Sequence, residues 1–294
     1  MIVTSCGNSL PIAKAIAKAL KAKFSPLTIS SFPDGDLYMK YNTDVKKHTV
    51  IIVHSLQPNP DTSLFDITCA AYTAKDLGAK KVILVAPYLS YMRQDKRFNP
   101  GECISSRIMA KMLNPCIDHL ITIDPHLHRY KSLRDIFTMK TSCLTANSLI
   151  AQYIKKHFNH PVIIGPDWES YQWAEEIAKE VGTQVTVLEK TRFSSRHVTS
   201  KMIHPVLLKD REVIIIDDIL STGHTICEGA KNAYAAGAHR VGAVVVHGLF
   251  VEDAIHKLKK AHVNDMISTN TIEHPTNRID VTPLLVEELK RLRI

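Results

Sequence analysis

The chain has 294 residues, 45% of them apolar, and a formal net charge of +8 from 37 basic and 29 acidic residues, which favours two domains with ordinary cores. The six cysteines stand singly and form no C-x-x-C pair, which argues against a disulfide framework or a zinc site and fits a cytoplasmic protein. Because the basic residues are dispersed and no apolar run approaches the roughly 18 residues of a membrane span, we expect neither nucleic acid nor a membrane as a partner.

The first half of the chain predicts a parallel α/β sheet. Segment 10–24 is expected to form an amphipathic helix, because lysines interrupt its apolar positions as they would not in a signal peptide. Strands are then expected at 50–55, 81–87 and 119–124, alternating with helices at 64–78, 102–114 and 146–158. Residues 140–154 resemble a polar lead-in to a connecting helix rather than a strand, so we place a domain boundary near residue 145.

The same alternation restarts in the second half and predicts a second α/β sheet. Strands are expected at 161–167, 184–190, 212–217 and 240–248, with helices at 170–181 and 224–236. The predicted domains are therefore 1–145 and 146–294, with the last helix a candidate to pack back on the first domain. From about 190 to 212 the chain is polar and shows neither helical nor strand period, which predicts a mobile loop.

The stretch "VIIIDDILSTGHT", residues 213–225, predicts a sugar-phosphate site. Asp217 and Asp218 are expected to close a strand, at the edge of a parallel sheet where ligands bind. Carboxylates accept hydrogen bonds from sugar hydroxyls, whereas a glycine and hydroxyl loop at a helix N-terminus favours a phosphate. The motif is neither a Walker A loop nor a dinucleotide fingerprint. For the two aspartates alone, a helix cap followed by an ordinary turn stays open as an alternative.

This stretch closely resembles the phosphoribosyl pyrophosphate signature of the type I phosphoribosyltransferase fold, and nearly the whole chain resembles the ribose-phosphate pyrophosphokinases. Four further stretches carry the resemblance: "SFPDGD" 31–36, "YMRQDKRF" 91–98, "IDPHLHR" 123–129 and "GPD" 165–167. It implies an α/β fold of two tandem type I phosphoribosyltransferase-like domains, each a mostly parallel sheet flanked by helices. It also implies a cytoplasmic homo-oligomer built from dimers, with a hexamer as one candidate.

The implied reaction transfers the β,γ-diphosphoryl group of MgATP to the 1-hydroxyl of ribose 5-phosphate, giving 5-phosphoribosyl 1-diphosphate and AMP. By resemblance, Asp217 and Asp218 would hold the ribose hydroxyls. The residues that would hold the 5-phosphate are Ser221, Thr222, Gly223, His224 and Thr225.

Two stretches of the first half would bind ATP. In "FPDGD" we expect a β-turn, with the Phe32 ring on adenine and a carboxylate accepting its exocyclic amine. In "YMRQDKRF" the basic residues around Asp95 suit a polyphosphate. By resemblance the ATP-site residues are Phe32, Asp34, Asp36, Arg93, Gln94 and Asp95. Taken alone, the first stretch would be only a turn and the second only a solvated loop. In the family the first loop reaches a neighbouring subunit's ATP site.

The resemblance also nominates metal-binding and catalytic residues. His126 and Asp167 stand at two strand ends and would hold a hydrated Mg²⁺, although Mg²⁺ prefers oxygen ligands and a purely structural histidine stays open. Lys190 and Arg192 would stabilise the charge of the transferred group. For Arg196 and His197 in the same segment, a solvated linker stays open as the alternative.

Two positions depart from the common family pattern: Gly101 stands where many relatives have an arginine near ATP, and Ser221 where many have an aspartate. Three other functions remain as alternatives. They are a phosphoribosyltransferase that consumes the activated sugar, a non-catalytic synthetase-associated regulatory subunit, and a nucleic-acid-binding module that rests on charge alone.

Overall fold

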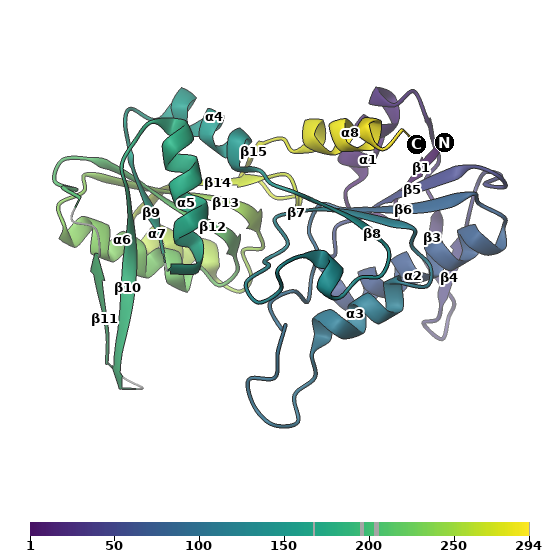
Figure 1. The fold of residues 1–294 in the computed structure, drawn as a ribbon, viewed down its shortest axis with the longest axis horizontal. Helices are drawn as coiled ribbons and strands as arrows, with labels where there is room; N and C mark the ends of the chain where they lie inside the picture. Colours follow the sequence, from purple (N-terminus) through teal and green to yellow (C-terminus); the bar gives the residue numbers. More distant parts are fainter. Residues whose placement is uncertain (167, 195–196, 203–205, 294) are drawn as a thin grey trace. The chain divides into compact units, whose positions relative to one another are not determined.

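The computed structural model describes residues 1–166, 168–194, 197–202 and 206–293, with the backbone alone at 168–169, 188–194 and 197–202. The chain forms two units (Figure 1). The first comprises Met1–Leu144, Thr271–Glu273 and the C-terminal segment from Val281; the second comprises Thr145–Asn270 and His274–Asp280. The C-terminal segment therefore belongs with the N-terminal half of the chain.

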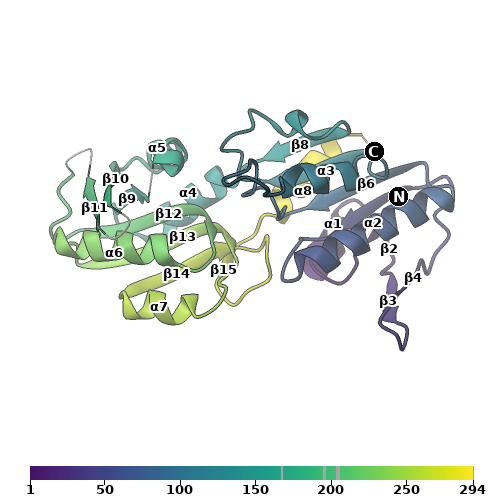
Figure 2. The same ribbon diagram turned by 90° about the horizontal axis from the view of Figure 1, so that it is seen from below.

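The first unit is built on a six-stranded parallel sheet in the order β2-β1-β5-β6-β7-β8. Its strands are β1 (Ile2–Thr4), β2 (Lys23–Phe24), β5 (Thr49–Val53), β6 (Lys81–Ala86), β7 (His119–Ile123) and β8 (Lys140–Leu144). Helices α1 (Leu10–Ala19) and α8 (Thr282–Arg291) cover one face, and α2 (Pro60–Asp76) and α3 (Ser105–Leu113) cover the other (Figures 1 and 2). Because both faces are covered, the central strands are continuous apolar runs.

Two smaller elements complete this unit. The strands β3 (Thr28–Ser31) and β4 (Leu37–Lys40) pair as an antiparallel hairpin, which projects from the rest of the unit in Figure 2. A short 3₁₀ helix, η1 (Leu133–Asp135), precedes β8.

The second unit is built on a seven-stranded sheet in the order β11-β10-β9-β12-β13-β14-β15, in which only β11 runs antiparallel among the described strands. Its strands are β9 (Val162–Gly165), β10 (Val185–Ser194), β11 (His197–Met202), β12 (Glu212–Leu220), β13 (Arg240–Gly248), β14 (Val263–Thr269) and β15 (Asn277–Ile279). Helices α4 (Asn147–His157) and α5 (Trp168–Val181) lie on one face, and α6 (His224–Ala235) and α7 (Ala254–Lys260) on the other.

The prediction of two mostly parallel sheets flanked by helices is confirmed, but two local predictions are wrong. Residues 140–144 are the edge strand β8 rather than part of a lead-in to a helix, because an edge strand can be polar and still form its backbone hydrogen bonds with β7. The strand expected at 184–190 is confirmed as the first part of β10, but the polar stretch after it, expected as a mobile loop, instead contains the end of β10 and all of β11, which pair antiparallel with Thr191 opposite Thr199. A hairpin is held by backbone groups and does not need the apolar period that we sought.

The predicted N-terminal helix is confirmed at Leu10–Ala19, although its expected last residues form β2. Among the described residues, no helix is long and apolar enough to cross a membrane.

Helix α8 is fixed to the first sheet by a buried polar chain. The His119 Nε2 lies 2.8 Å from the Ser142 Oγ, which donates to the Glu288 Oε1 at 2.5 Å. Glu288 also accepts from the Arg291 Nε and Nη2 at 2.6 and 2.7 Å. Because His119, Ser142 and Glu288 are all buried, these contacts replace the water that each polar group loses on folding.

His54, directly after β5, is a second buried polar residue of this unit. Its side chain is 2% exposed, and its Nε2 lies 3.3 Å from the Asn8 Nδ2, an amide donor. The Nε2 therefore accepts, and a second proton there would face the Asn8 amide. Burial lowers the pKa of His54 to about 4. The imidazole is neutral in the folded protein at neutral pH.

We expect His54 to lower the free energy of unfolding at acidic pH. An unfolded histidine has a pKa of about 6.5, so the unfolded chain takes up this proton first and the free energy of unfolding falls between pH of about 6.5 and about 4, by up to ~1.4 kcal/mol per pH unit. Urea unfolding at pH 7, 6 and 5 measures the slope. His54→Gln, whose Oε1 can still accept from Asn8, should show a smaller slope; an unchanged slope would exclude His54 as the cause.

Candidate active site

The predicted sugar-phosphate loop lies between β12 and α6. Strand β12 continues to Leu220, so the prediction that it ends at Asp217 and Asp218 is wrong: the parallel ladder with β13 pairs Asp217 with Val245 and Leu220 with Gly248. Both aspartate side chains are half-buried. The Leu220 carbonyl accepts from the Leu249 and Phe250 amides at 2.9 and 3.2 Å, which fixes the start of the loop.

Gly223 caps helix α6 with a backbone that suits glycine. Its φ is 75°, in the left-handed region, and an added Cβ would lie 3.3 Å from the Leu258 Cγ. A glycine cap has no side chain to bind the first amides of the helix. These amides and the positive end of the helix dipole therefore suit an anion. His224 is exposed, with its Nε2 3.3 Å from the Glu228 Oε1 one turn along α6.

The predicted adenine-binding turn joins β3 to β4 in the first unit. The predicted β-turn is confirmed: the Gly35 amide donates to the Phe32 carbonyl at 2.9 Å, and the Asp36 amide donates to the Asp34 Oδ1 at 3.2 Å. Phe32 is 51% exposed, with its ring edge-on to Tyr38 at 5.7 Å between centroids. An exposed aromatic ring beside two exposed carboxylates can bind a flat polar ring.

The basic loop after β6 contains exposed cationic side chains and one buried carboxylate. Arg93, Lys96 and Arg97 are exposed. Gln94 accepts from the Ser105 Oγ at 2.9 Å through its Oε1. Asp95 is different, because its carboxylate is buried and paired with Arg129 at 3.1 Å. Its side chain is therefore suited to holding the loop rather than to contacting a ligand.

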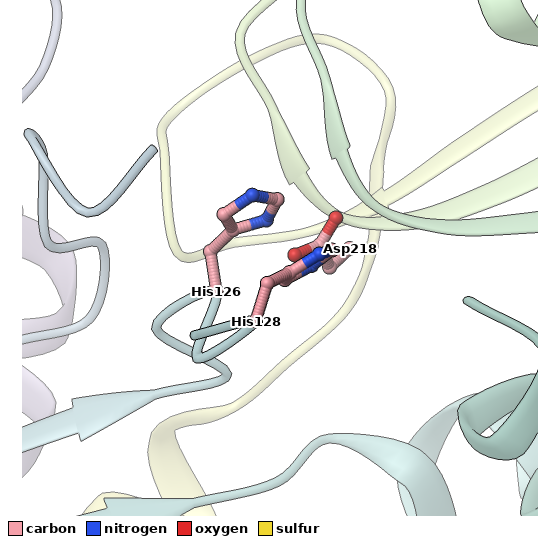
Figure 3. A group of neighbouring side chains, drawn as sticks. All are labelled: His126, His128 and Asp218. Carbon is pink, nitrogen blue, oxygen red and sulfur yellow. The ribbon is translucent and has the colours of Figure 1, made fainter. Parts of the chain in front are cut away.

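His126 follows β7 in a strained turn. Asp124 and His126 have backbone φ values of 38° and 55°, which residues other than glycine rarely adopt. Such backbone strain clusters at functional sites. The His126 and His128 rings are stacked with centroids 3.7 Å apart, and each offers a ring nitrogen to a metal. Figure 3 shows these two imidazoles on the loop after β7, and also draws Asp218, which comes from β12.

Comparison with known proteins identifies the family. Residues 1–116 match the family model of the N-terminal domain of ribose phosphate pyrophosphokinase, and residues 133–284 match that of the phosphoribosyl transferase domain. The chain is 32% identical to the ribose-phosphate pyrophosphokinase of Methanopyrus kandleri, with 99% of each chain covered. It belongs to the ribose-phosphate pyrophosphokinase family.

Further similarities agree with this membership. The chain is also 32% identical to the ribose-phosphate pyrophosphokinase of Saccharolobus solfataricus, over 92% of this chain and 93% of that protein. Its fold matches the crystal structure of phosphoribosylpyrophosphate synthetase from Mycobacterium smegmatis with a TM-score of 0.87 at 23% identity, covering 99% of this chain and 98% of that one. The resemblance stated from the motifs is confirmed.

Three predicted site residues of this family member cannot be placed in full. Asp167 lies outside the described residues. Lys190 and Arg192 have a described backbone, in β10, but their side chains lie outside the described part of the chain. Their proposed roles rest on the motifs.

Sequence reasoning missed two residues whose side chains contact predicted site residues. Arg129 received no role, because its partner Asp95 is 34 positions away and no local pattern reports such a pair. The motifs assign no role to His128, yet its ring stacks on that of His126. No local pattern signals this second pair, because His126 lies in a left-handed turn rather than in an extended segment.

Proposed function

We propose that this chain is a ribose-phosphate diphosphokinase that transfers the β,γ-diphosphoryl group of ATP to the 1-hydroxyl of ribose 5-phosphate. The observation that carries the proposal is the match over 99% of each chain to a ribose-phosphate pyrophosphokinase. A phosphoribosyltransferase has no need of the N-terminal ribose phosphate pyrophosphokinase domain that residues 1–116 match. The activated sugar would therefore be made by this chain.

The second unit would hold ribose 5-phosphate. Asp217 and Asp218 accept hydrogen bonds from the ribose hydroxyls, while the amides of the α6 N-terminus, which no cap side chain binds, hold the 5-phosphate with the loop hydroxyls. The loop residues assigned to the phosphate are Ser221, Thr222, Gly223, His224 and Thr225. Carboxylates and anion-binding amides thus serve opposite ends of one ligand.

The first unit would hold ATP. Phe32 stacks on adenine and Asp34 or Asp36 accepts its amine, in the site of a neighbouring subunit of a homo-oligomer, while Arg93 and Gln94 contact the polyphosphate. The 1-hydroxyl oxygen then bonds to the β-phosphorus and releases its proton to water, as the bond from that phosphorus to the α,β-bridging oxygen breaks and AMP leaves. Lys190 and Arg192 stabilise the charge of the group in transfer.

Mg²⁺ is the cofactor that this reaction requires. It would neutralise the polyphosphate charge when bound. Carboxylate donors such as Asp167 suit this ion, whereas an imidazole suits it less, so His126 would contact a water of a hydrated ion or orient its neighbours. We propose the cytoplasm as the place of action, consistent with six unpaired cysteines among the described residues.

A direct test is AMP release from ATP by the purified full chain. With Mg²⁺, AMP should form only when ribose 5-phosphate is present, and without any nucleobase. Running the assay with and without inorganic phosphate and ADP reports regulation. Absence of turnover under all of these conditions would contradict the proposal and support a non-catalytic subunit. Consumption of added 5-phosphoribosyl 1-diphosphate together with a base, without AMP release from ATP and ribose 5-phosphate, would support a phosphoribosyltransferase.

A further inference from the structure

The Asp95–Arg129 ion pair joins two loops of the first unit. Asp95 lies in the basic loop after β6, and Arg129 lies three residues after His126 in the loop after β7. The Arg129 Nη1 donates to the Asp95 Oδ1 and Oδ2 at 3.1 and 3.3 Å. The Asp95 side chain is 1% exposed and that of Arg129 is 41% exposed. A carboxylate this buried depends on its partner, whereas a solvated pair would contribute little.

Hydrogen bonds between uncharged groups also join the loops after β6 and β7. The Tyr130 hydroxyl donates to the Asp95 carbonyl at 3.2 Å and lies 3.0 Å from the Ser106 Oγ. The Ser106 Oγ in turn donates to the Gln94 carbonyl at 3.1 Å. Tyr130 and Ser106 are buried. The backbone at Gln94 and Asp95 is therefore held from both sides, next to the exposed Arg93.

Arg129 also contacts the far side of the basic loop. Its Cζ lies 5.5 Å from the centroid of the Phe98 ring, and the Lys96 Nζ lies 5.1 Å from the same centroid. Phe98 is 55% exposed. Two cations therefore bind one ring by cation–π attraction. Arg129 thus contacts both the buried Asp95 and the exposed Phe98 of this loop.

We infer that Arg129 is a positioning residue for ATP binding, acting through Asp95. This inference rests on the proposed function. By holding Asp95, Arg129 sets where Arg93 and Gln94 meet the polyphosphate, and it ties that loop to the turn that carries His126. Because Asp95 neutralises Arg129, the exposed cations Arg93, Lys96 and Arg97 remain the ones that face an anion.

The test compares Arg129→Met with Arg129→Lys in AMP-release kinetics. Arg129→Met should raise the KM for ATP by roughly tenfold or more, because charge-assisted hydrogen bonds to a buried carboxylate are lost, while the KM for ribose 5-phosphate changes less than about twofold. Arg129→Lys should restore most of the ATP affinity, since one nitrogen makes both contacts to Asp95. Arg134 is an exposed arginine five residues along the chain, so Arg134→Met is the matched control and should leave both KM values unchanged.

Asp95→Asn tests the other partner and keeps the inference testable if Arg129→Met does not fold. It should raise the KM for ATP in the same way, and thermal unfolding of each variant separates loss of structure from loss of binding. An unchanged KM for ATP in the folded variants, or an equal rise of both KM values, would overturn the role of Arg129. Absence of AMP release by the unmodified chain would instead contradict the proposed function.

Discussion

Replacing Lys190 by alanine is expected to lower kcat by on the order of 10²- to 10⁴-fold, which corresponds to roughly 3 to 6 kcal/mol of transition-state stabilisation. Phosphoryl transfer depends chiefly on positioning the substrates and on neutralising the charge of the transferred group in the transition state. A cation that acts mainly in the transition state contributes to kcat rather than to substrate affinity. The KM for ribose 5-phosphate should therefore stay nearly constant, as steady-state AMP release would show.

Two comparisons make the Lys190 result specific. Lys190→Arg keeps the positive charge and should retain more activity than the alanine variant, whereas Arg192→Ala should resemble Lys190→Ala. Lys179, an exposed lysine on α5 paired with Glu175, provides a control whose alanine variant should have the activity of the unmodified chain. A normal kcat for Lys190→Ala would remove this residue from the catalytic role.

Replacing Glu288 by alanine is expected to lower the free energy of unfolding by roughly 2 to 4 kcal/mol. The carboxylate is buried between Ser142 and Arg291, so its removal takes away the acceptor of the buried Ser142 hydroxyl and the partner of the Arg291 guanidinium. Helix α8 would lose its polar attachment to the first sheet. Urea unfolding at neutral pH measures the loss. Glu287→Ala is the matched control, because Glu287 is the exposed neighbour on the same helix.

The loss from Glu288→Ala should depend on pH. Hydrogen bonds from the Arg291 guanidinium hold the pKa of Glu288 below its usual value, and the Ser142 hydroxyl acts in the same direction. A carboxyl with a lowered folded pKa stabilises the fold above its unfolded pKa of about 4.3, and this contribution is lost as the pH falls through the lower folded value. The difference between Glu288→Ala and the unmodified chain should thus shrink in acid. A constant difference would show that the effect is packing alone.

Much of the fold was predictable because buried parallel strands leave a local signal. Residues 50–53 and 82–86 are apolar on both faces of the sheet, and the helix between them has its own period. The strand β8, the end of β10 and the strand β11 gave no such signal, because polar residues can form the same backbone ladder. Their place depends on the strand beside them, which local pattern does not report.

For the candidate site, the contiguous motif at 217–225 determined by itself that two carboxylates precede a glycine-containing loop and a helix N-terminus. A strand end, a left-handed glycine and a helix N-terminus are all set by neighbours in the chain. The tertiary structure alone decided that Asp95 is buried against Arg129 and that Glu288 is attached to Ser142 on another strand. These partners are 34 and 146 positions apart, and such pairs are selected by packing rather than by sequence spacing.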